Sequence, residues 1–375
     1  MWLITLVKLL IDGADMTDIH DLERTTTIRI IQDDADTILS LLSSVHDSVF
    51  AMEIIPYYAL FVQSCQECMG SNFIPEGTVT NIRDMRNHIK VYADSFGKSK
   101  RRIALIDSKQ DMSFGSQLKF GFLKNLNIHY NLGIYLTEDR HIIGNTQQLA
   151  DFLGVEDIFD QGVGNKFFDL GKQVGRFVAF VNNYFPQTFI RSKAAQTVGA
   201  VKIKYYCDIN TNRHNKLFVD NECKELNLFY LHLLCGMNFV RYILCPLFPM
   251  ENTWVFRVEY IVTYYTFRAL TKLKSHCESN DDVISDINGI EDLKNGSSEL
   301  FQSKFRNCMM HYGLENQNLL SIKYIDRPFF GIIENCFDGM DYKTYVSALH
   351  DFSDKLICFL EEHFDCSDIK LKQLT

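Results

Sequence analysis

Apolar residues recur at helical spacing along most of this chain, and this pattern limits its fold more than any other feature. In residues 33–50 the apolar positions are Ile38, Leu41, Leu42, Val45 and Val49. Intervals of three and four residues place such side chains on one face of a helix. Comparable faces occur at 222–244, 251–276 and 341–363. The sequence therefore predicts a mainly α-helical protein.

The composition agrees with long, packed elements. The 375 residues include only 6 Pro and 20 Gly but 29 Phe and 17 Tyr, and 46% of the residues are hydrophobic. This excludes disordered and fibrous classes. The formal net charge of −9 argues against a protein that coats nucleic acid, because such binding needs a basic face. A small basic cleft on an acidic body remains compatible with this charge.

Changes in the residue pattern along the chain divide it into three segments. We expect an N-terminal helical region at 1–125, a mixed helical segment at 126–216 and an antiparallel helical bundle at 217–375. In the middle segment, runs rich in Val, Ile and Tyr surround a polar turn, which predicts a small β-hairpin near 199–219. The acidic segment 277–298 is expected to be an exposed loop.

The eleven cysteines are odd in number and most lie in apolar, helix-like stretches, which indicates buried thiols in a reducing compartment. Cys65 and Cys68 have the spacing of half a zinc site, but no second pair completes it, so we expect no metal and no cofactor. Lys8 interrupts the apolar N-terminus, which favours a buried helix over a signal peptide. We found no uninterrupted apolar run of about 18 residues, and therefore expect a cytoplasmic protein without a membrane span.

One helical segment carries the residues of greatest chemical interest, in the order Lys304, Arg306, Asn307, His311 and Tyr312. Asn307 and His311 are four residues apart and therefore neighbours on one helix face. Arg306 lies roughly 140° from His311 around the helix axis, by the 3.6-residue period. Both side chains can contact one phosphate only if the long Arg306 side chain reaches around the helix.

This Arg–Asn–x–x–x–His pattern resembles the signature of the HEPN superfamily, over about residues 217–365. The resemblance implies a four- or five-helix bundle with the motif on a late helix. It also implies a metal-independent endoribonuclease in which Arg and His from two motifs line one cleft. Arg306 would then stabilise the developing phosphorane charge, His311 would transfer protons, and Asn307 would occupy the polar position of the motif.

The chemistry implied by this resemblance needs more than one motif. Attack by the 2′-OH of RNA requires a base beside the nucleophile and an acid beside the leaving 5′-oxygen, on opposite sides of phosphorus. One histidine cannot occupy both sides, so we expect a homodimer or an intramolecular pseudo-dimer. RNA is the expected substrate and an antitoxin protein a candidate partner. Lys304, Tyr312 and Arg257 are further candidates for contacts with RNA.

A second match to the pattern consists of Arg83, Asp84 and His88. One interpretation is a solvated helix face opposite an apolar stripe within the expected helix at 78–96. The other is a degenerate HEPN-like bundle at 1–125, whose motif would pair with the first motif inside one chain.

Two alternatives to the nuclease remain open at this stage. His311 can be a structural histidine that binds carbonyl groups at a helix end. The bundle can also be an inactive HEPN-like module for dimerisation, RNA binding or partner binding. A nuclease requires Arg306 and His311 to open onto a shared groove.

Overall fold

The computed structural model describes residues 16–70, 82, 90, 92–118, 128–155, 158–184, 201–280, 287–295, 299–314, 318–338 and 340–374. The fold is mainly α-helical with a small antiparallel sheet, which confirms the predicted fold class. The expected helix at the N-terminus and most of the expected helix at 78–96 lie outside the described residues. The helices of eight residues or more are α2 (Met16–Ser44), α4 (Ile55–Met69), α6 (Phe96–Ser116), α7 (Thr146–Leu153), α8 (Gly162–Tyr184), α9 (Lys224–Asn238), α10 (Thr253–Asn280), α11 (Ile287–Asn295), α12 (Ser303–His311) and α14 (Tyr342–Glu361).

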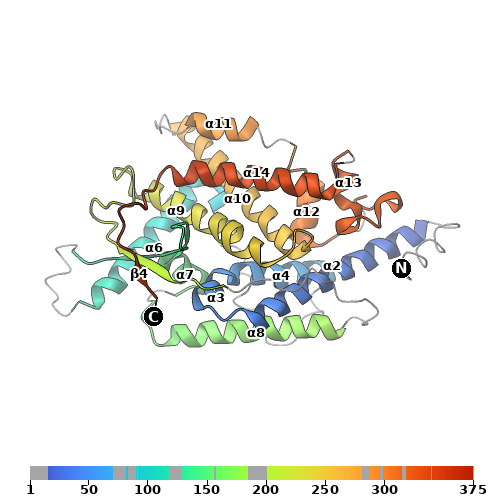
Figure 1. The fold of residues 1–375 in the computed structure, drawn as a ribbon, viewed down its shortest axis with the longest axis horizontal. Helices are drawn as coiled ribbons and strands as arrows, with labels where there is room; N and C mark the ends of the chain where they lie inside the picture. The colour runs from blue at the N-terminus through green and yellow to red at the C-terminus, as the bar shows by residue number, and fades with distance from the viewer. Residues whose placement is uncertain are drawn as a thin grey trace.

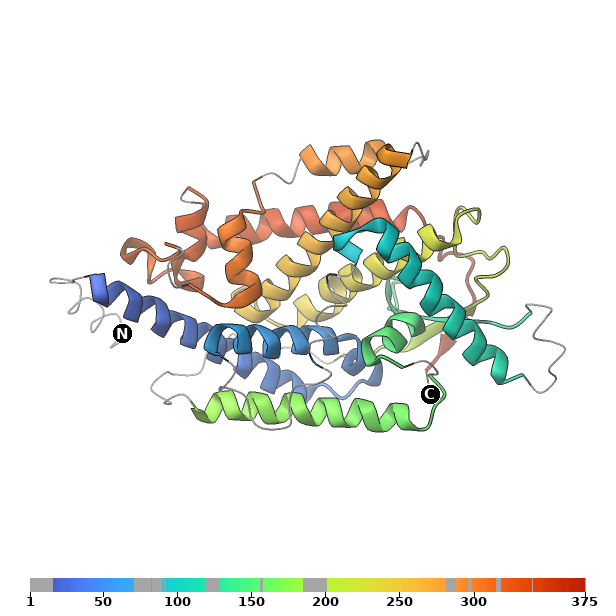
Figure 2. The ribbon, with the colours of Figure 1, turned by 180° about the vertical axis from the view of Figure 1, so that it is seen from behind.

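Most of these helices are stacked in layers between α14 and α8, and α11 lies beyond α14 at the edge of the stack (Figure 1). Figure 1 shows α14 along one side of the molecule and α8 along the opposite side. Helices α9 and α10 pack against α14 and against each other, while α2 and α4 contact α8. The layers meet where α2 packs on α10 and α4 packs on α12; Figure 2 shows the same stack from behind. The N-terminal helices therefore complete the packing of the C-terminal bundle.

Short elements connect and extend the helices. They are α3 (Ser48–Glu53), α13 (Ile332–Cys336), the 3₁₀ turns η5 (Cys245–Leu247), η6 (Ile322–Tyr324) and η7 (Pro328–Gly331), and the π-helix η4 (Phe239–Leu244). The helical stretch breaks at Ile54 between α3 and α4, and Pro56 lies in the first turn of α4, where its missing N–H has no partner to lose.

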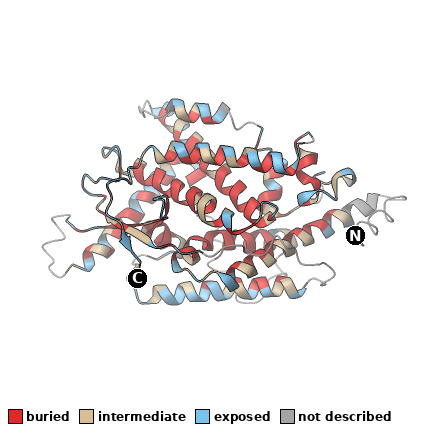
Figure 3. Ribbon diagram, in the orientation of Figure 1, coloured by how far each residue is buried: buried red, intermediate tan, exposed pale blue. Residues whose placement is uncertain are grey.

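One hydrophobic core runs through the stack. Figure 3 shows buried residues concentrated in the inner helices, with exposed positions on the outer faces of α8, α11 and α14. The ring of Tyr58 stacks on Trp254 at 5.9 Å, and Phe61 meets Tyr312 edge-on at 6.2 Å. Both contacts join the segment expected at 1–125 to the segment expected at 217–375. No gap in the core follows the boundaries expected from sequence, as far as the described residues extend.

The sheet has the strand order β2-β1-β3-β4, with β1 (Leu132–Leu136), β2 (Ile142–Asn145), β3 (Tyr205–Ile209) and β4 (Lys372–Gln373). The predicted hairpin at 199–219 is wrong in its pairing, because β3 pairs with β1 and β4 rather than with the chain after the turn. Two bonds between Asn131 and Thr211, each 2.8 Å long, hold the start of β1 beside the end of β3. The strand itself was predicted correctly, and its partner lies about 70 residues away in sequence.

The acidic segment contains regular structure where a loop was expected. Helix α10 continues to Asn280, and α11 occupies Ile287–Asn295. The side chains of Ile290 and Leu293 are buried against the bundle. Two apolar side chains at helical spacing therefore hold α11 on the surface despite its acidic neighbours.

Two helical stretches have the length and hydropathy of membrane spans. They are Ser48–Met69 and Lys224–Leu247, and 83% and 72% of the residues in their apolar 18-residue windows are buried within the fold. The sequence reading missed them because it counted uninterrupted apolar runs. Buried core helices meet the same criterion, so this finding is weak evidence for a membrane.

Candidate functional site

Helix α12 carries the first motif and presents one face to solvent. It packs between α4 and α10 through Phe305, Cys308 and Met309, all fully buried. Arg306 and His311 are partly exposed and Asn307 is exposed, so the three motif residues lie on the outward side. The 3.6-residue period places Asn307 between the other two around the helix.

The Arg306 guanidinium turns toward Asn307. One terminal nitrogen donates to the Asn307 Oδ1 at 2.9 Å, and the other donates to the Tyr264 hydroxyl of α10 at 3.2 Å. The charged group also lies 5.8 Å from the centre of the Tyr264 ring. The Arg306 side chain thus extends around the helix toward the side that carries His311. The roughly 140° between the two residues makes this necessary if both are to contact one phosphate.

A carboxylate on α4 holds the His311 ring. The Nδ1 atom lies 2.5 Å from the Glu67 Oε2, and the other oxygen of Glu67 accepts from Gln63 at 3.1 Å. Donation from Nδ1 to a carboxylate leaves Nε2 as the basic nitrogen of a neutral ring. The His311 side chain is 44% exposed, so water and solutes reach this ring.

Two residues expected to contact RNA lie inside the protein. Arg257 and Tyr312 are 2% and 1% exposed, and their burial corrects the prediction that they offer surface to a ligand. Arg257 Nε donates to Asp34 at 3.0 Å, and the Tyr312 hydroxyl donates to the same oxygen at 2.6 Å. The Arg257 guanidinium also lies 3.9 Å from the centre of the Tyr312 ring.

This buried cluster fixes the end of α12. A terminal nitrogen of Arg257 donates to the carbonyl oxygens of Cys308 and Met309 at 2.8 and 2.7 Å. The Ser64 hydroxyl donates to Met310 at 2.5 Å. Tyr312 ends the helix in a left-handed conformation with φ of 58°. Carbonyl groups at a helix end need such donors when they are buried, so Arg257 positions His311 without touching it.

The remaining predicted site residues are less informative. Lys304 is exposed on the first turn of α12. The second motif, Arg83, Asp84 and His88, lies outside the described residues. The sequence reading missed Glu67 and Tyr264. Glu67 lies between Cys65 and Cys68, the pair with the spacing of half a zinc site. Neither cysteine forms a disulfide, and Cys65 is fully buried.

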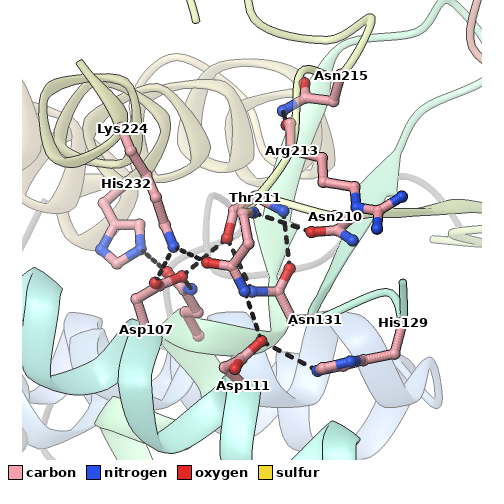
Figure 4. Close-up of polar contacts among 12 residues, drawn as sticks. Asp107, Asp111, His129, Asn131, Asn210, Thr211, Arg213, Asn215, Lys224 and His232 are labelled. Atoms are coloured by element: carbon pink, nitrogen blue, oxygen red, sulfur yellow. Dashed lines mark hydrogen bonds and ion pairs between the residues drawn. The ribbon is translucent and has the colours of Figure 1, made fainter. Parts of the chain in front are cut away.

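A second polar cluster joins α6, α9 and the sheet (Figure 4). The Asp107 carboxylate contacts Lys224 at 2.5 Å, and accepts from Gln147 at 2.8 Å and from Thr211 at 3.1 Å. Asp111 lies 3.0 Å from His129. Hydrogen-bond donors therefore surround the Asp107 carboxylate. Such a buried polar network serves to hold the loops in place.

Buried His232 of α9 extends this network toward the core. Its Nδ1 lies 2.5 Å from the Tyr92 hydroxyl, and its Nε2 lies 3.3 Å from Gln147 Oε1. Burial lowers the pKa of His232 to about 4, against a smaller opposing effect of Asp151. The ring is consequently neutral at physiological pH.

Within the described ranges, no group of three or more His, Cys, Asp or Glu side chains is arranged to hold a metal ion. No family model, curated protein or solved structure matches this chain.

Proposed function

We propose that this protein is a metal-independent endoribonuclease of HEPN type, with a role in a toxin–antitoxin or phage-defence system. The observation that carries the proposal is the pair of groups on α12. The cationic Arg306 and the carboxylate-held His311 flank one solvent-facing helix surface. A cation and an imidazole are the groups that cleavage of RNA by its own 2′-OH needs.

In the proposed reaction, the 2′-oxygen loses a proton and bonds to phosphorus, and the bond to the 5′-oxygen breaks as that oxygen gains a proton. The Nε2 atom of His311 takes part in one of these proton transfers. Arg306 stabilises the negative charge of the pentacoordinate phosphorus. Glu67 keeps the imidazole in one orientation and one tautomer.

A second motif supplies the other proton transfer in this proposal. It comes from a second copy of the chain, whose α12 face packs across a two-fold axis, or from Arg83 and His88 of the same chain. The reaction takes place in the cytoplasm, where thiols stay reduced, and none of the eleven cysteines forms a disulfide.

Cleavage of RNA in the presence of EDTA tests the proposal. We expect His311→Ala to lower kcat at least about 100-fold, the usual scale for a lost proton-transfer group. Arg306→Ala should lower kcat by about 100-fold or more, because it removes the charge that stabilises the transition state. The control His214→Ala changes an exposed histidine in the loop after β3 and should leave kcat unchanged. Expression of the wild type should be toxic, and expression of His311→Ala harmless.

The variant Glu67→Gln tests whether Glu67 positions the His311 ring for catalysis or has only a structural role. We expect it to lower kcat and to shift the pH profile of kcat, because the ring loses its carboxylate partner. A purely structural role would leave the pH profile unchanged. Wild-type protein that is harmless and leaves RNA intact would refute the nuclease and favour a non-catalytic module for dimerisation, RNA binding or partner binding.

A further inference from the structure

Arg306 shares its phenol partner with a second arginine. Arg268, one turn beyond Tyr264 on α10, donates from a terminal nitrogen to the Tyr264 hydroxyl at 3.1 Å. Its Nε donates to the Ala93 carbonyl oxygen at 3.2 Å. With the 3.2 Å bond from Arg306, two guanidinium groups converge on one oxygen atom.

Neither guanidinium has a carboxylate partner in the part of the chain that the structure describes. Arginines elsewhere do pair with acids, as Arg241 does with Asp354 and Arg257 with Asp34. The chain carries nine more acidic than basic residues, yet no acid contacts either of these two adjacent cations in the described part of the chain. Like charges this close repel each other, and an anion between them would relieve that repulsion.

The phenol and both guanidinium groups have donors to spare. Each guanidinium has five N–H bonds and uses two of them in the described contacts. The Tyr264 oxygen accepts two of these bonds, which leaves its own O–H free to donate outward. Burial raises the pKa of Tyr264, but the hydrogen bonds and the positive charges of Arg306 and Arg268 together lower it more, so its pKa lies below the ordinary value.

We propose that Arg306, Arg268 and Tyr264 form a subsite that binds a phosphate group of an RNA strand. All three are partly exposed, so a ligand reaches them while their charges are partly shielded from water. Guanidinium groups bind phosphate through paired N–H donors, and the phenol adds a third kind of donor. The inference rests on the proposed function, to which it adds Arg268 and Tyr264 as substrate-binding residues.

Binding of an RNA strand that cannot be cleaved tests the subsite. The probe is a short fluorescent 2′-O-methyl RNA, measured by fluorescence anisotropy with the full-length wild type and with Arg268→Gln and Tyr264→Phe. We expect Arg268→Gln to raise Kd at least about tenfold, as for a lost hydrogen bond between charged groups. It should also make the slope of log Kd against log salt concentration smaller, by about the amount that one phosphate contact contributes.

The matched control is Lys272→Gln, which removes a positive charge from an exposed position one turn further along α10. We expect its Kd to stay within about twofold of the wild type, because exposed charges contribute little. Thermal unfolding of each variant shows whether it is folded. Competition with inorganic phosphate and with AMP then separates free phosphates from an RNA strand as the source of the bound group.

The possible outcomes distinguish the two proposals. If Arg268→Gln binds as the wild type does, or if no probe binds to the wild type, the subsite is refuted. If binding depends on Arg268 but unmodified RNA is never cut, the subsite stands and the nuclease is wrong. If Arg268→Gln cleaves RNA with unchanged kcat and KM, the nuclease stands and the subsite is wrong.

Discussion

The buried pair between Arg257 and Asp34 offers the sharpest test of how the candidate site is supported. Replacing Arg257 with Met keeps most of the apolar side chain and removes the guanidinium. Asp34 then keeps hydrogen bonds from Tyr312 and Thr253, at 2.6 and 2.7 Å, but has no cation. The Met309 carbonyl of α12 also loses the donor that Arg257 provides, whereas the Cys308 carbonyl keeps the backbone N–H of Tyr312.

The size of the effect follows from these contacts. Breaking a buried ion pair by removing one partner costs about 3–5 kcal/mol. Each buried carbonyl left without a donor adds about 1–3 kcal/mol, although these costs are not additive. We therefore expect Arg257→Met to lower the free energy of unfolding by about 5 kcal/mol, a large part of the 5–15 kcal/mol typical of a folded protein.

Urea unfolding at pH 7 measures this change, with Arg241→Met as the matched control. Arg241 makes a two-bond pair with Asp354, at 2.7 and 3.0 Å, but the two side chains are 25% and 45% exposed. We expect the control to lose about 1 kcal/mol or less. The double variant Asp34→Asn with Arg257→Met should recover stability relative to Arg257→Met, since no buried charge remains. Equal losses in Arg257→Met and Arg241→Met would refute this account of the site.

Two further predictions concern pH. Burial raises the pKa of Glu53 well above its ordinary value, so the folded state holds this proton more tightly than the unfolded state does. The stability therefore falls as pH rises above about 4.5, by up to about 1.4 kcal/mol per pH unit. Glu53→Gln should remove this loss and be the more stable protein at pH 8 in urea unfolding; the same dependence of stability on pH in both proteins would contradict this prediction. The pKa of His232, lowered from 6.5 to about 4, acts in the opposite direction: the unfolded state binds the proton more tightly, so about 3 kcal/mol of stability is lost as pH falls from 6.5 to 4. His232→Gln should flatten that acid limb, which unfolding curves between pH 4 and 7 would measure.

Local patterns predicted the helices well because a buried helix face leaves a regular mark in the sequence. The sheet was harder to predict. Strand β1 is buried on both faces except at Tyr135, so it lacks the alternation that identifies a half-exposed strand. The turn after it contains no glycine, and Arg140 adopts the left-handed conformation instead, with φ of 67°. Strand β3 was recognised, but nothing local identified β1 as its partner.

The candidate site was predictable in part for the same reason. The spacing of Arg306, Asn307 and His311 fixes their common face once α12 is a helix. The partners of these residues depend on tertiary packing. Arg257 is one of two charged residues in the first half of α10, residues 253–267, and only the position of Asp34, 223 residues away, turns it into a buried structural group. Glu67 reaches His311 across 244 residues, which no sequence spacing reveals.

The distance along the chain between α12 and its supports has a consequence for folding kinetics. The bonds that hold the end of α12 span 285, 278 and 246 residues, from Thr27 and Asp34 in α2 and Ser64 in α4. Contacts this distant in sequence form slowly, because a large loop must close before they stabilise anything. Residues on the α12 face are synthesised long after α2, so the face takes its final shape only late in folding. A nascent or partly folded chain would therefore lack the site, and activity would appear only with the completed molecule.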